Sequence, residues 1–158
     1  MNSIADFEDI LALFEEHKVH YLIVGGLAFI FHAKPRYTKD MDLWVENSEQ
    51  NIVRANQALA EYGSPVLLDR HAPGQIVQIG VEPNRIDILV DMGQLSFATA
   101  WEKRIESTYG GSRACWIDIE SLLTIKSSID HPRHQEDARV LRQILDQRHK
   151  TEPGSGTH

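Results

Sequence analysis

The segment Asp40–Val45 constrains the fold most, because acidic and apolar residues alternate along it. Residues two apart on a strand point to the same side of the sheet. Asp40 and Asp42 therefore project together, ~7 Å apart along the strand. The opposite side takes the apolar residues Met41, Leu43 and Val45. The pattern predicts a strand with one buried face and two neighbouring carboxylates on the other.

The remaining sequence predicts strands and helices in mixed order. Val19–Val24 is a compact apolar run that is typical of a buried strand, and Gly25-Gly26 ends it. Ile76–Val81 and Arg85–Val90 read as a hairpin across Glu82-Pro83-Asn84. A further short strand is expected over Ala114–Ile117. Helices are expected over Ile4–His17, Leu27–His32, Ser48 to about Gly63, Ser96 to about Ile105, Asp118 to about Ile129, and Glu136–His149. The expected class is α/β or α+β, with a mixed central sheet flanked by helices.

The bulk properties predict one domain of 158 residues with a formal charge of −7. We expect the domain to cover residues 1–150 and the tail 151–158 to be disordered. The longest apolar run, Tyr21–Ala33, is too short to cross a membrane. The single cysteine, Cys115, excludes an internal disulfide and fits a reducing cytoplasm. A broad basic face for nucleic acid is excluded, but residues 131–150 carry five Arg or Lys against three acids and could contact an RNA backbone.

The acidic strand predicts a metal site. Two adjacent carboxylates repel one another unless a cation or proton lies between them, and Mg²⁺ prefers such oxygens together with substrate phosphates. Asp87, alone in an apolar strand, is the best third ligand for two Mg²⁺ ions ~3.5–4 Å apart. Gly25 and Gly26 would let a triphosphate approach the backbone at the start of the next helix.

These motifs resemble the DNA polymerase beta superfamily of nucleotidyltransferases, most closely the bacterial branch of type IV toxins and abortive-infection enzymes. The resemblance rests on Val24-Gly25-Gly26-Leu27-Ala28, on Pro35-Arg36-Tyr37-Thr38-Lys39-Asp40-Met41-Asp42-Leu43, which is also similar to CCA-adding enzymes, and on Ile86-Asp87-Ile88. Many members have Gly-Ser where this chain has Gly25-Gly26. The resemblance implies Mg²⁺-dependent transfer from a nucleoside triphosphate to an RNA (a tRNA end) or protein hydroxyl. It also implies a bacterial toxin–antitoxin role with an antitoxin partner.

Further nucleotide-binding residues follow less directly. Arg36 precedes the acidic strand, where it suits a phosphate contact, and Thr38 is a second candidate beside it. Lys126 and Asp137 resemble the downstream Lys and Asp motif of the toxin branch, but either could equally be a solvated or helix-stabilising residue.

Alternatives remain open at this stage. Asp87 could form a structural salt bridge with Arg85 or Arg36, and His131 to His134 reads as a solvated turn that could line the acceptor site. The chain could also be a catalytically inactive binding or regulatory protein of the same fold, or a two-metal phosphohydrolase or nuclease.

Overall fold

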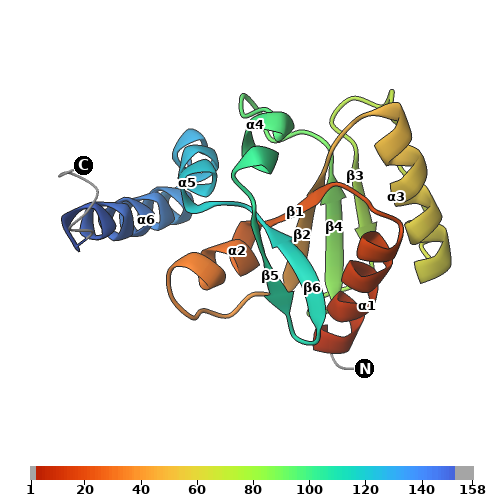
Figure 1. Cartoon of the computed structure of the whole chain (residues 1–158), viewed down its shortest axis with the longest axis horizontal. Helices are drawn as coiled ribbons and strands as arrows, with labels where there is room; N and C mark the ends of the chain where they lie inside the picture. The colour runs from red at the N-terminus through yellow and green to blue at the C-terminus, as the bar shows by residue number, and fades with distance from the viewer. Residues whose placement is uncertain (1–2, 152–158) are drawn as a thin grey trace.

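The computed structural model describes residues 3–151, and the backbone over this range forms one mixed sheet with helices on both faces (Figure 1). The predicted fold class is confirmed. The helices are α1 Ser3–Glu16, α2 Gly25–His32, α3 Glu49–Tyr62, α4 Phe97–Glu102, α5 Ile119–Ser128 and α6 Pro132–Thr151. The strands are β1 Tyr21–Val24, β2 Asp40–Val45, β3 Ile76–Ile79, β4 Arg85–Leu89, β5 Ile105–Tyr109 and β6 Ser112–Trp116. The disordered tail expected over 151–158 falls, after Thr151, outside the described residues.

The sheet has the strand order β3-β4-β2-β1-β6-β5. β2 pairs with β4 and β1 with β6 in parallel, while β1–β2, β3–β4 and β5–β6 are antiparallel. The hairpin predicted for β3 and β4 is therefore confirmed. Fully buried side chains of the central strands, among them Ile23, Leu43 and Ile86, form the middle of the core.

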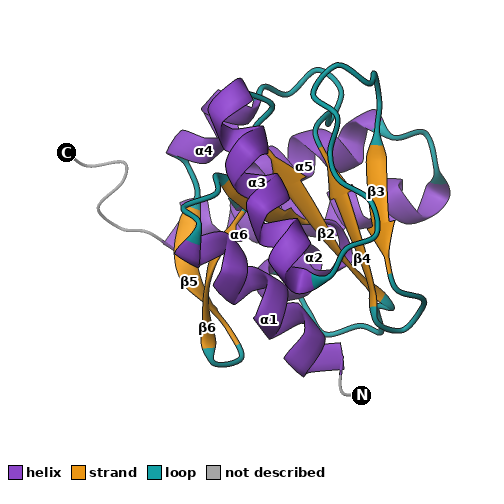
Figure 2. Ribbon diagram, turned by 90° about the vertical axis from the view of Figure 1, so that its right-hand side faces the viewer, coloured by secondary structure: helices purple, strands orange, loops and turns teal. Residues whose placement is uncertain are grey.

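Helices cover the two faces of this sheet unequally. α1 and α3 lie against one face, whereas α2, α5 and α6 lie on the other (Figures 1 and 2). The ends predicted for α3 are confirmed, because Ser48 accepts a hydrogen bond from the Asn51 amide and Gly63 ends the helix in the left-handed conformation. α6 packs mainly on α5, so these two helices form a helical hairpin at one side of the molecule.

Two expectations about element boundaries were wrong. The helix expected from Ser96 to Ile105 ends at Glu102, and Ile105–Tyr109 is an edge strand. Exposed side chains on both of its faces leave no alternation of apolar and polar residues that could reveal the strand. The last helix begins at Pro132 rather than Glu136, with a proline in the first turn where its missing N–H costs nothing.

Candidate active site

The three acids predicted as metal ligands come together through the register of two parallel strands. Asp42 on β2 lies directly beside Asp87 on β4, and Asp40 lies beside Arg85. Since alternate residues share a face, the two cross-strand pairs project from the same side of the sheet. One oxygen of each of Asp40, Asp42 and Asp87 lies within 4.8 Å of the others. We call these three residues the carboxylate triad.

Arg85 partly neutralises this triad. Its Nη2 donates a hydrogen bond to Asp40 Oδ2 at 2.8 Å, and its Nε lies 3.2 Å from Asp87 Oδ1. The salt bridge considered from the sequence is thus present, but one guanidinium faces three carboxylates. The cluster keeps an excess of negative charge.

Burial and like charges raise the pKa values of the two inner acids. The pKa of Asp42 rises from 3.8 to about 7, mainly through burial and then through the charges of Asp40 and Asp87. The pKa of Asp87 also rises, again mainly because of burial, although Arg85 opposes the shift. Near neutral pH the metal-free triad therefore tends to retain a proton on Asp42.

The triad fits a divalent cation on its own geometry. Asp87 Oδ1 is buried and has no hydrogen-bond partner among residues 3–151, since Arg85 Nε is near but poorly oriented. A buried carboxylate oxygen without a partner is costly unless a ligand satisfies it. Mg²⁺ takes oxygen ligands of this kind and keeps further positions for water and phosphate.

Gly25 and Gly26 form the wall beside the triad. Gly25 has φ +69°, and the place where a Cβ would stand is already taken by Asp42 Oδ2. A Cβ on Gly26 would lie 2.8 Å from Thr38 Oγ1. The residue before them, Val24, supplies no side-chain cap to α2, so the first amide groups of this helix remain available to an anion.

A buried network of ion pairs holds two cations in the same region as Gly25 and Gly26. Asp137 on α6 is ion-paired with Arg36 and, at 3.0 Å, with Lys126 Nζ; only 4% of Asp137 and 5% of Lys126 is exposed. The Arg36 guanidinium also stacks on the Phe29 ring, 4.0 Å from its centre. The predicted residues Arg36, Lys126 and Asp137 are thus brought together, with Asp137 holding the two cations in position.

His134 completes the network. Its Nδ1 lies 3.2 Å from Lys126 Nζ. Because an ammonium group only donates, Nδ1 must accept and the neutral ring carries its hydrogen on Nε2. Burial, followed by the charge of Lys126, lowers the pKa of His134 and favours this neutral form. The turn expected at His131–His134 is in fact the start of α6, and His134 faces the site.

These groups line one cleft of about 370 Å³, which we call the cationic cleft. It joins the glycine wall, part of the triad and side chains from the α2–β2 loop and the α5–α6 hairpin. Its lining residues are Gly25, Gly26, Arg36, Tyr37, Thr38, Lys39, Asp40, Asp42, Glu82, Lys126, Arg133 and His134. Asp137 is not among them, so it acts on a ligand only through Arg36 and Lys126.

Several of these residues were missed by sequence reasoning. Arg85 was considered only as a structural salt-bridge partner of Asp87, and Tyr37, Lys39 and Glu82 were not singled out as site residues. The signal for Tyr37 and Lys39 was their position within the motif before Asp40. Arg133 lies in the turn that was expected to be able to line the acceptor site, and the structure places it in the cationic cleft.

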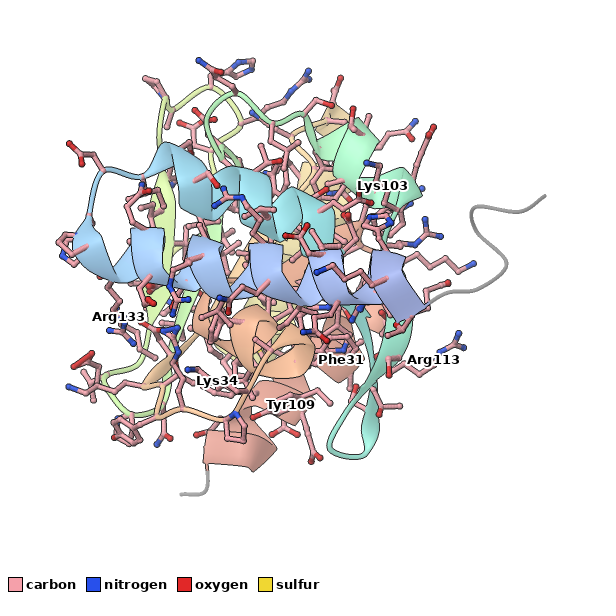
Figure 3. All side chains as sticks on the ribbon, turned by 90° about the vertical axis from the view of Figure 1, so that its left-hand side faces the viewer. Phe31, Lys34, Lys103, Tyr109, Arg113 and Arg133 are labelled. Atoms are coloured by element: carbon pink, nitrogen blue, oxygen red, sulfur yellow. The ribbon has the colours of Figure 1, made fainter. Side chains whose placement is uncertain are left out.

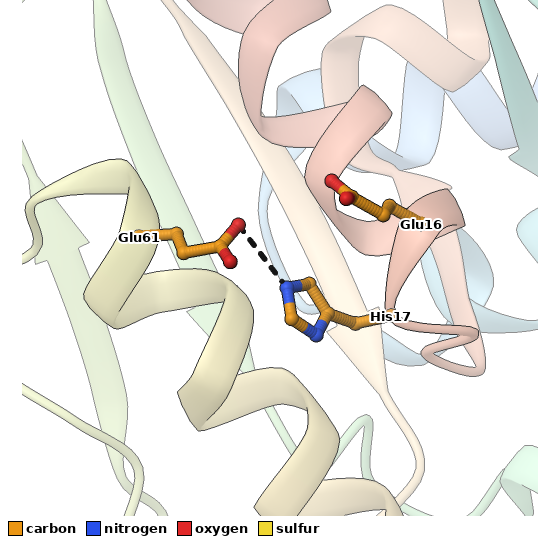
Figure 4. A group of neighbouring side chains, drawn as sticks. All are labelled: Glu16, His17 and Glu61. Carbon is orange, nitrogen blue, oxygen red and sulfur yellow. Dashed lines mark ion pairs between the residues drawn. The ribbon is translucent and has the colours of Figure 1, made fainter.

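A second acidic group lies between α1 and α3 (Figure 4). Glu16 and Glu61 flank His17, and His17 Nε2 lies 3.2 Å from Glu61 Oε2. Both glutamates are exposed, whereas His17 Nε2 is buried. This group gives no second metal site of comparable burial.

Comparison with known proteins supports the fold. No protein-family model matches the sequence, and no curated protein matches it. Solved structures do match. The lincosamide antibiotic adenylyltransferase LnuA, in its lincomycin-bound structure, aligns with 89% of this chain and 96% of its own at 21% identity and a TM-score of 0.60. ANT(2″)-Ia in complex with adenylyl-2″-tobramycin aligns with 90% of this chain and 88% of its own at 18% identity and a TM-score of 0.63.

A nucleotidyltransferase-like protein from Paracoccidioides brasiliensis aligns with 92% of this chain and 76% of its own at 16% identity and a TM-score of 0.53. Within residues 3–151, none of the helices combines the length and apolar character that crossing a membrane requires.

At these identities the likeness to the three solved structures concerns the arrangement of strands and helices. The chain therefore has the nucleotidyltransferase fold.

Proposed function

We propose that this protein is a Mg²⁺-dependent nucleotidyltransferase that moves a nucleotidyl group from a nucleoside triphosphate to a hydroxyl acceptor. The observation that carries the proposal is the placement of the carboxylate triad beside the uncapped start of α2, at the edge of the cationic cleft. Carboxylates suit the metal, while backbone amides and cations suit the polyphosphate. The antibiotic adenylyltransferases of the same fold support the same reaction class.

In the proposed reaction the acceptor oxygen forms a bond to the α-phosphorus while the bond from that phosphorus to pyrophosphate breaks. Two bound Mg²⁺ ions would neutralise the charge that develops on the attacking and leaving oxygens. Asp40 and Asp42 would hold these ions from β2. Asp87 would complete the site, and its Oδ1, which accepts no hydrogen bond among the described residues, would receive the proton of the acceptor hydroxyl. Arg36 and Lys126 stabilise the departing pyrophosphate.

The acceptor proposed from the sequence is an RNA end or a protein hydroxyl, in a toxin-like protein with an antitoxin partner. The charge of α6 supports RNA. Glu136 is neutralised by Arg139, whose Nε donates to its two oxygens at 2.6 and 2.9 Å, and Asp137 is neutralised inside the network. Four basic residues of α6 then face one remaining acid, Asp146: they are Arg133, Arg142, Arg148 and Lys150. Figure 3 shows Arg133 near the N-terminal end of α6.

Label transfer tests the proposal. The protein is incubated with each α-labelled nucleoside triphosphate, Mg²⁺ and one of three acceptors: total RNA, total protein, or an aminoglycoside or lincosamide. We expect incorporation in one acceptor class and its loss in Asp42→Asn. Absence of transfer in every combination, with triphosphate binding intact, would instead favour the inactive binding protein of the same fold.

A further inference from the structure

A second, apolar hollow adjoins the triad. It has a volume of about 150 Å³ and lies between the end of β4, the segment after it, and α5. Its wall is built mainly from the aliphatic side chains Val24, Leu89, Met92, Leu122, Ile125 and Ile129. We call it the apolar pocket. It is smaller than the ~300–1,000 Å³ typical of drug-sized ligands, so it has room for a single ring system.

The apolar pocket and the cationic cleft meet at the reaction centre. Both are lined by Gly25, Asp42, Lys126 and His134. On one side of Asp42 a ligand would therefore meet cations and open amides, and on the other side it would meet aliphatic side chains. A single extended ligand with an anionic half and an apolar half can occupy both spaces.

We infer that the apolar pocket binds the nucleobase of the triphosphate, an inference that rests on the proposed function. A nucleoside triphosphate has a polyanionic end and a flat heterocycle with apolar faces, and its reacting α-phosphorus lies between the two. The cationic cleft and the apolar pocket follow one another in the same order, with the Asp42 carboxylate between them. The reverse orientation would put phosphates against aliphatic walls, where desolvation opposes them.

The walls also indicate how the base is recognised. Among the lining side chains of the described chain, Asp42, Lys126 and His134 carry groups that form strong hydrogen bonds. The proposed function uses Asp42 for the metal and Lys126 for the phosphates, which leaves His134 for the base. The aliphatic side chains would contact the faces of the ring, which are similar in all bases. They cannot form hydrogen bonds with the donors and acceptors on the edges of the ring, by which the bases differ. The pocket therefore contributes affinity for a base more than discrimination between bases.

Comparing a nucleoside triphosphate with inorganic tripolyphosphate tests this inference, because tripolyphosphate lacks the base. Ile129 is 36% exposed, so Ile129→Trp should fill the pocket without removing a core side chain. Met92, which is partly buried, gives a second variant, Met92→Ala, that enlarges the pocket. Val53→Trp adds the same ring at a 52% exposed position of α3 and is the matched control.

Calorimetric titrations in Mg²⁺ give the readout. We expect Ile129→Trp to weaken binding of the tightest triphosphate about tenfold, the loss that follows when roughly 60 Å² of apolar surface stays in water. Met92→Ala should weaken it severalfold. Tripolyphosphate affinity should be unchanged in both variants, and Val53→Trp should match the wild type with both ligands.

Two results would overturn the inference alone. Unchanged triphosphate affinity in Ile129→Trp and Met92→Ala would show that the base lies elsewhere, and if transfer nevertheless fell, the pocket would belong to the acceptor. An equal loss for triphosphate and tripolyphosphate would show that the substitutions disturb the cationic cleft. Failure of the proposed function is distinguishable, since the wild-type protein would then transfer no label to any acceptor, whether or not these titrations place a base in the apolar pocket.

Discussion

The variant Asp42→Asn tests whether the Asp42 carboxylate lowers the stability of the metal-free fold. Asp42 has its pKa raised from 3.8 to about 7 in the folded protein. At ~1.4 kcal/mol per pKa unit, holding Asp42 ionised in the fold costs up to about 4 kcal/mol. The pKa of about 7 already includes the opposing charge of Arg85. Solvent near the site lessens the cost further, so we expect the metal-free variant to be more stable than the wild type by ~1–3 kcal/mol at pH 8.

The stability difference between Asp42→Asn and the wild type should depend on pH, in a direction that follows from the raised pKa of Asp42. A carboxyl whose pKa is raised by folding contributes stability while it is protonated, below about pH 4, and this contribution is lost as the pH rises through about 7. Asparagine does not titrate. The advantage of Asp42→Asn should therefore be largest at pH 8, smaller at pH 6 and close to zero at pH 4.

Urea unfolding in EDTA, followed by tryptophan fluorescence at these three pH values, measures the difference. Asp118→Asn is the matched control: Asp118 is buried and caps α5 by accepting a hydrogen bond from the Ser121 amide. Asparagine caps about as well as aspartate, so this variant should change stability little at any pH. An Asp42→Asn protein that is less stable than the wild type at pH 8 would refute the reasoning and give Asp42 a structural role.

Three further predictions concern the wall, the network and the acceptor. Gly25→Ala should abolish transfer while leaving a folded protein of reduced stability, because the new Cβ collides with the Asp42 carboxylate at a positive φ; circular dichroism and label transfer check both parts. Asp137→Ala should lower the free energy of unfolding by ~3–5 kcal/mol, since it leaves Lys126 charged and buried, and the double variant with Lys126→Met should recover part of that loss in urea melts. Arg142→Glu should weaken RNA binding, and flatten its salt dependence in filter-binding assays, without changing triphosphate affinity; an unchanged RNA affinity would remove α6 from the acceptor site.

The sequence predicted the carboxylate strands because their evidence is local. Alternation along Asp40–Val45 requires a strand, and a lone acid in Arg85–Leu89 requires a partner. The pairing of β2 with β4 is not local, since the two strands are separated by about forty residues. The sequence predicted that Asp87 joins Asp40 and Asp42, but the parallel register that places Asp42 beside Asp87 is known only from the structure.

The cationic side of the site was harder to predict. A lysine on an amphipathic helix is usually solvated, and Lys126 looks no different in the sequence. Its burial depends on Asp137, which α6 brings back across α5. A helix–helix angle of this kind has no signature in residue spacing, so the direct ligand role expected for Asp137 could not be distinguished from its observed place behind the cations.

Arg85 has a consequence for metal affinity. Its guanidinium already contacts Asp40 and Asp87, the same carboxylates that a divalent cation would use. Arg85 would therefore compete with a metal ion for these carboxylates. The free metal concentration at which the site fills would then depend on how much more strongly the carboxylates bind the metal ion than the Arg85 guanidinium. Removing that competitor would lower the threshold for metal while making the empty protein less stable. If the proposed function holds, Arg85, which lies on β4 beside Asp40, would set how much Mg²⁺ the protein needs before it can transfer a nucleotide.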